Sequence, residues 1–106
     1  MVNETQIVLC TVPDEAAARQ IATALVAERL AACVNIVPGV TSVYRWKDAV
    51  ETGAELLLII KTTATVYPRL QDRIRLLHPY ELPEVIAVSL ARGLPEYLTW
   101  IKTAVE

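Results

Sequence analysis

Apolar and β-branched residues concentrate in four segments that have the pattern of strands. These segments cover residues 6–12, 32–46, 55–63 and 85–90. The second is interrupted at Pro38-Gly39, but β-type residues resume at Val40, so we expect a bulge or kink there rather than an end. Residues 48–53 are polar and predict a turn between the second and third strands.

Between these strand segments, apolar residues recur at the spacing of helices. Asp14 and Glu15 stand where a helix N-terminus favours acidic side chains, and apolar residues recur after them at positions 18, 21, 22, 25 and 30. Pro68 suits the first turn of a second helix, whose apolar face is formed by Val66, Leu70, Ile74 and Leu77. A short C-terminal helix opens after Gly93 and carries Leu98, Trp100 and Ile101.

The resulting order, β-α-β-β-α-β plus a terminal helix, predicts an α+β protein with a ferredoxin-like fold in one domain, residues 1–106. In that fold the two main helices cover one face of a four-stranded sheet. Successive apolar residues in the run 56–60 point to opposite faces, so the second face is apolar too. We expect the sheets of neighbouring subunits in a cyclic homo-oligomer to cover it. The alternative cover, the C-terminal helix alone, is short for that task.

Composition narrows the classes of function. The chain is 54% apolar with a net charge of −2, and no Lys/Arg cluster suggests a nucleic-acid surface. No apolar run exceeds the five residues of 56–60, far fewer than a membrane span needs. The first residues lack the features of a signal peptide, so we expect a cytoplasmic protein. Cys10 and Cys33 lie outside any C-x-x-C motif and are expected to be reduced, apolar fillers.

The segment His78–Glu84, with the sequence HPYELPE, concentrates the candidate chemistry. It holds the only histidine of the chain, a phenol and two carboxylates, and its two prolines restrict the backbone. No nucleophile stands beside His78 and Glu81, and no glycine-rich phosphate loop is present, so we expect binding rather than catalysis. The alternative interpretation is a rigid corner between the second helix and the fourth strand.

A second candidate site is a polar pocket. Tyr44 and Trp46 share one face of the second strand, and Lys61 ends the third. Tyr80 and Glu81 lie on the proline-restricted segment His78–Glu84, which we call the stiff segment. Pockets at subunit interfaces commonly combine apolar walls with a few polar groups. We expect a small anionic or zwitterionic ligand there, with Lys61 or Arg45 as the counter-charge. Alternatively, the two aromatic residues of the strand are interface anchors.

Six blocks of sequence follow one another in a recognisable order: LCTVPDE (9–15), ERLAACVN (28–35), PGVTSVYRW (38–46), IKTT (60–63), HPYELPE (78–84) and YLTWI (97–101). Together these blocks resemble the CutA family of divalent-cation tolerance proteins. The resemblance implies a ferredoxin-like, PII-like homotrimer with its sheets packed inside. It also implies a role in tolerance of copper or other divalent metals. The PII-like assembly further suggests a small-molecule sensor or a scaffold that anchors a partner protein.

The resemblance also implies candidate metal ligands. Cys10 matches a first-strand cysteine of the family, and His78 matches the second of two adjacent histidines. The first histidine position is Leu77 here, and a further family cysteine falls at Arg73. A thiolate and an imidazole suit copper or zinc, but zinc sites use three or four protein ligands. Further ligands would have to come across subunit boundaries, from Cys33, Glu81 or Glu84, so we expect weak binding of copper or another divalent cation.

Overall fold

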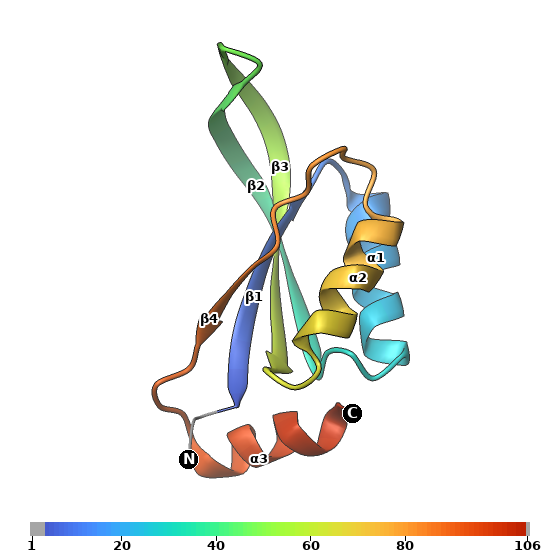
Figure 1. Cartoon of the computed structure of the whole chain (residues 1–106), viewed down its shortest axis with the longest axis vertical. Helices are drawn as coiled ribbons and strands as arrows, with labels where there is room; N and C mark the ends of the chain where they lie inside the picture. The colour runs from blue at the N-terminus through green and yellow to red at the C-terminus, as the bar shows by residue number, and fades with distance from the viewer. Residues whose placement is uncertain (1–3, 106) are drawn as a thin grey trace.

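The computed structural model describes residues 4–105 as one antiparallel four-stranded sheet with three helices (Figure 1). The order of elements is the one predicted from the sequence. The strands are β1 (Thr5–Val12), β2 (Cys33–Trp46), β3 (Ala49–Thr63) and β4 (Ile86–Ser89), and the helices are α1 (Glu15–Ala27), α2 (Tyr67–Leu77) and α3 (Pro95–Ala104). No helix in this part of the chain is both long and apolar enough to cross a bilayer.

The strands lie in the order β2-β3-β1-β4, and every neighbouring pair is antiparallel. β2 and β3 form a long hairpin that projects beyond the rest of the sheet (Figure 1). The predicted turn at residues 48–53 was wrong, because β3 already begins at Ala49. Lys47 and Asp48 both have positive φ, 50° and 67°, so they reverse the chain within two residues. The polar residues after them belong to an exposed strand rather than to a loop.

The predicted bulge in β2 is confirmed by a register shift between Val37 and Val40. Gly39 supplies the left-handed backbone, with φ 78°. The shift changes which side chains face the helices. Before it, Ile36 pairs with the buried Leu58, whereas after it Val40 pairs with Glu55, three positions away on β3. Even-numbered residues of β2 therefore pass from the helix-covered face of the sheet to the opposite face.

The core lies between the sheet and the pair of helices α1 and α2, which cover the same face (Figure 1). Asp14 caps α1 by accepting a 2.8 Å hydrogen bond from the Ala17 amide, and Pro68 occupies the first turn of α2. Most of the fully buried side chains come from alternate strand positions and from one stripe of each of these two helices, among them Val8, Cys10, Val12, Ile21, Leu25, Leu58, Ile60, Leu70 and Ile74.

The opposite face of the sheet is apolar and is only partly covered within the chain. Ile86 and Val88 on β4 are 52% and 53% exposed, and Leu9 and Ile7 beside them are half-buried. α3 crosses one end of the sheet, as Figure 1 shows, with Ile101 buried. α3 therefore leaves these β4 side chains accessible, and we call this surface the open face.

Candidate functional site

His78 follows the last residue of α2 and turns its ring into the protein, with only 7% of the residue exposed. Its Nδ1 accepts a 3.1 Å hydrogen bond from the Tyr80 backbone N–H, so Nδ1 carries no proton. Nε2 therefore carries the proton and donates to the Thr11 carbonyl oxygen at 2.7 Å. Both ring nitrogens of a neutral imidazole are occupied by protein partners.

Cys10 belongs to the buried face of β1 and has no exposed surface. Its Sγ donates a long 3.8 Å hydrogen bond to the same Thr11 carbonyl. Burial, with smaller contributions from Glu84 and Glu55, raises the pKa of the thiol to about 12. Since metals and electrophiles react with the thiolate, this cysteine is poorly suited to either.

Two further positions of the suggested metal site, Leu77 and Arg73, have structural contacts of their own. Leu77 packs against the core, and Arg73 makes a bidentate ion pair with Glu28 at 2.9–3.2 Å. Within residues 4–105, no group of three or more His, Cys, Asp or Glu side chains is placed to hold a metal ion. The structure brings Cys10 and His78 to one carbonyl oxygen, but their polar atoms are already engaged there.

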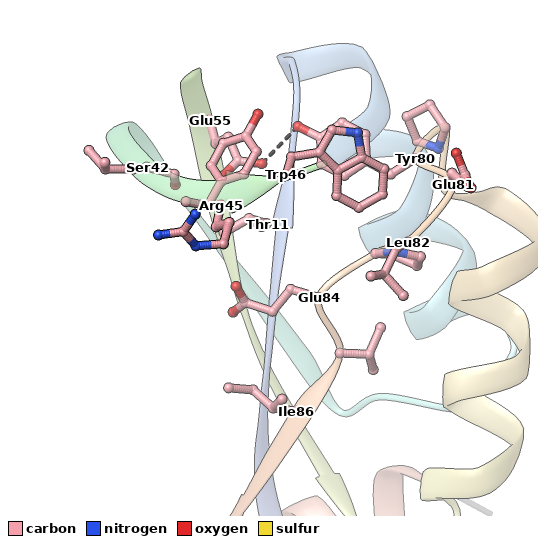
Figure 2. Close-up of a pocket in the computed structure, with 15 residues that line it drawn as sticks. Thr11, Ser42, Arg45, Trp46, Glu55, Tyr80, Glu81, Leu82, Glu84 and Ile86 are labelled. Atoms are coloured by element: carbon pink, nitrogen blue, oxygen red, sulfur yellow. Dashed lines mark hydrogen bonds between the residues drawn. The ribbon is translucent and has the colours of Figure 1, made fainter. Parts of the chain in front are cut away.

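A cleft of about 950 Å³ lies between the β2–β3 hairpin and the stiff segment, at the end of the molecule opposite α3 (Figures 1 and 2). Tyr44, Trp46 and Glu55 line it from the hairpin. The β2 bulge is the reason that the two aromatic side chains share the face of Glu55, because it reverses the alternation of β2. Tyr80 and Glu84 close the opposite wall.

Two carboxylates and a phenol interact inside the cleft. The Tyr80 hydroxyl donates to Glu55 Oε2 at 2.7 Å, drawn as the dashed line in Figure 2. Burial and the Glu55 carboxylate both raise the pKa of Tyr80, so the phenol remains a proton donor. Burial, and then the charge of Glu55, also raise the pKa of the Glu84 carboxyl. The Tyr80 ring lies 4.7 Å from the His78 ring, centroid to centroid, which anchors the phenol wall.

Five of the residues selected from the sequence line this one cleft: Tyr44, Arg45, Trp46, Tyr80 and Glu81. Lys61 does not line it. It lies six residues further along β3, roughly 20 Å away at the rise of a strand, where it contacts Asn35 Oδ1. Within one chain Lys61 is therefore separated from the cleft, because β3 begins well before it. That these groups meet across a subunit interface stays a prediction.

Glu55 is the charged lining residue that sequence reasoning missed. A signal for it exists: it is the carboxylate that directly precedes the apolar run 56–60 and shares the face of Leu57 and Ile59. A charge at the end of such a strand is expected at a polar cavity or a strand terminus. The turn predicted for the residues just before Glu55 hides its position on the sheet.

Comparison with known proteins gives a consistent result. A family model described as CutA1 divalent ion tolerance protein matches residues 6–104. The divalent-cation tolerance protein CutA of Thermus thermophilus is 56% identical over 97 residues, covering 92% of this chain and 94% of that protein. Protein CutA of Mus musculus is 46% identical over 96 residues, covering 91% of this chain but only 54% of the mouse protein. The chain thus spans about half the length of that relative. A solved structure of the divalent cation tolerance protein (Cut A1) from Thermus thermophilus matches with a TM-score of 0.95 at 53% identity, covering 96% of this chain and 99% of that one.

Proposed function

The chain belongs to the CutA1 divalent ion tolerance family, and on that premise we propose that it acts in divalent-cation tolerance as a homotrimeric binding protein. We propose that it does so in the cytoplasm and by binding or signalling rather than by catalysis. The observation that carries this proposal is the cleft, which combines aromatic walls with carboxylates beside an uncovered apolar sheet face.

The trimer is supported by the open face. The strand order and the two covering helices support a ferredoxin-like fold, and a PII-like trimer would bury the exposed Ile86 and Val88 between sheets. Light scattering tests this assembly: wild type should have the mass of three chains, and Val88→Lys should shift it toward the monomer. Leu76→Lys, at a 77% exposed position on α2, is the matched control and should remain trimeric. A monomeric wild type would refute the assembly.

A binding role is supported by the state of the reactive groups. The Cys10 thiol is buried with a pKa of about 12, and His78 has both ring nitrogens occupied. Neither is set up as a nucleophile or a general base. The groups that do face the cleft, Tyr44, Trp46 and Glu84, are suited to holding a ligand. A small-molecule sensor with this cleft as its ligand site therefore agrees best with the geometry.

We propose that any copper or other divalent-cation binding by this chain is weak and does not use Cys10 and His78 as a dedicated centre. Isothermal titration with Cu(II) and Zn(II) tests this directly. The expected result is no tight stoichiometric binding to the wild type, and no difference in His78→Ala. Stoichiometric, sub-micromolar binding that His78→Ala abolishes would refute it.

The ligand role of the cleft is tested with a panel of small metabolites in a thermal-shift assay, because a ligand that binds the native state must stabilise it. Trp46 gives a second readout. In a Trp100→Phe variant it is the remaining indole of the chain, so a ligand in the cleft should change its fluorescence. A panel that changes neither the melting temperature nor the fluorescence would contradict the proposal.

A further inference from the structure

We infer that the cleft recognises a small organic cation, such as a quaternary or primary ammonium compound. This inference rests on the proposed ligand role of the cleft and names the class of ligand. It replaces the anionic or zwitterionic ligand expected from the sequence, which relied on Lys61 or Arg45 as the counter-charge. Arg45 lines the cleft, but it is outnumbered there by carboxylates. Lys61 does not line the cleft.

The charge of the lining favours a cation. Three carboxylates line the cleft, Glu55, Glu81 and Glu84, against one guanidinium, Arg45. Figure 2 shows the Arg45 side chain extending away from the wall formed by Tyr80 and Glu81. The nearest available charge to a ligand between the two walls is therefore negative.

Glu55 and Glu84 are arranged as acceptors with unused capacity. Glu55 is oriented by the 2.7 Å hydrogen bond from the Tyr80 hydroxyl to its Oε2, which leaves Oε1 to accept from a ligand. Among residues 4–105, none donates a hydrogen bond to the Glu84 carboxylate or forms an ion pair with it. Burial and then the nearby Glu55 carboxylate raise the pKa of Glu84, and a cation bound between the two walls would offset this repulsion.

The aromatic wall supplies the second half of the recognition. Tyr44 and Trp46 line the cleft and are 48% and 37% exposed in the single chain, so both rings can contact a ligand there. Ring faces carry negative potential and attract ammonium groups, Trp most strongly. The ammonium of Lys47, at the hairpin tip, already lies 5.9 Å from the centre of the Trp46 ring. This contact shows that the environment of the indole tolerates a positive charge.

An organic cation fits these groups better than a metal ion does. Metal sites need several ligands converging on one point, and no group of three or more candidate side chains converges anywhere in the described residues. A cleft of about 950 Å³ with aromatic walls is also far larger than a bare ion requires. Carboxylates set against aromatic faces are the combination that recognises ammonium compounds.

The test uses three probes of one shape that differ in charge: choline, its neutral carbon isostere 3,3-dimethyl-1-butanol, and the anion 3,3-dimethylbutyrate. Binding to the whole chain is measured by isothermal titration at constant ionic strength, and by Trp46 fluorescence in Trp100→Phe. The variant is Glu84→Gln, which removes the charge but keeps the size. The control is Glu51→Gln, the same change at an exposed position on β3 outside the cleft.

We expect saturable choline binding, at least about tenfold weaker binding of the neutral isostere, and no binding of the anion. Glu84→Gln should weaken choline binding by about tenfold and leave the neutral probe unchanged, whereas Glu51→Gln should bind choline like the wild type. Equal binding of choline and its isostere, or tighter binding of the anion, would overturn the inference while leaving a ligand cleft in place. If a neighbouring subunit's Lys or Arg fills the cleft, choline will not bind and Glu84→Gln will weaken the trimer, which also overturns it. Failure of every compound, including the wider metabolite panel, would overturn the proposed function itself.

Discussion

Replacing His78 separates a structural role of the imidazole from a metal-binding one. In His78→Ala the Thr11 carbonyl and the Tyr80 backbone N–H both lose their partner, at 2.7 Å and 3.1 Å. An unsatisfied buried group costs about 1–3 kcal/mol, and both groups here are only partly buried. We therefore expect the free energy of unfolding to fall by about 3 kcal/mol in total.

Two conservative variants divide this loss between the hydrogen bonds. In His78→Gln the amide nitrogen reaches roughly where Nε2 lay and restores the bond to the Thr11 carbonyl. In His78→Asn the side-chain oxygen takes the place of Nδ1 and accepts from the Tyr80 N–H. Each variant should recover about 1 kcal/mol of the loss. A metal centre predicts no such recovery, because an amide does not replace an imidazole as a copper or zinc ligand.

The assay is guanidinium unfolding at one fixed protein concentration, because the stability of an oligomer depends on concentration. Each of the four proteins is measured with and without a chelator. We expect the order wild type, then the two amide variants, then His78→Ala, with no effect of the chelator. The reasoning is refuted if the chelator lowers the wild type to the level of His78→Ala, or if all three variants are equally destabilised.

Three further predictions follow from other parts of the structure. Glu84→Gln should raise the free energy of unfolding at neutral pH: the folded-state pKa of Glu84 lies above its ordinary value of 4.5, so its ionisation costs stability as pH rises through that range. The advantage should vanish below pH 4.5 in denaturant titrations across pH, and an advantage that persists in acid would contradict it. The Cys33→Ser variant leaves Cys10 as the remaining thiol, and Cys10 should resist thiol labelling at about pH 8 until the protein is unfolded, because it is buried and its pKa is about 12. Mass spectrometry measures the labelling, and rapid labelling of the native protein would contradict this prediction. Gly39→Ala should cost about 1 kcal/mol in the same unfolding assay, since its φ of 78° strains an L-residue although nothing lies within 4 Å of the added methyl; an unchanged stability would show that the bulge relaxes.

Several features of the fold were readable from local sequence. The bulge at Pro38-Gly39 and the first turn of α2 at Pro68 follow from the backbone preferences of these residues, and the element order follows from the spacing of apolar residues. The boundary of β3 was not readable, because residues 49–53 are polar on an exposed hairpin and polar strands resemble turns. Only the positive φ of Lys47 and Asp48 shows that the chain has already reversed.

Part of the candidate site could also be predicted from local sequence patterns. Tyr80 and Glu81 follow from the stiff segment, and Tyr44 and Trp46 from their shared parity on one strand. Glu55 gains its position from pairing with Val40 across the shifted register, which depends on two strands together.

The sequence by itself determined the secondary-structure order, the apolar second face of the sheet and the membership of a family, because these depend on residue type and spacing along the chain. Only the tertiary structure determines the environment of the reactive groups. The Cys10 thiol and His78 Nε2 both donate to the Thr11 carbonyl oxygen, and His78 Nδ1 accepts from the Tyr80 N–H. Lys61 lies outside the cleft. Hydrogen-bond partners, burial and the distance between charges are properties of how strands and loops meet in space, so no local pattern encodes them.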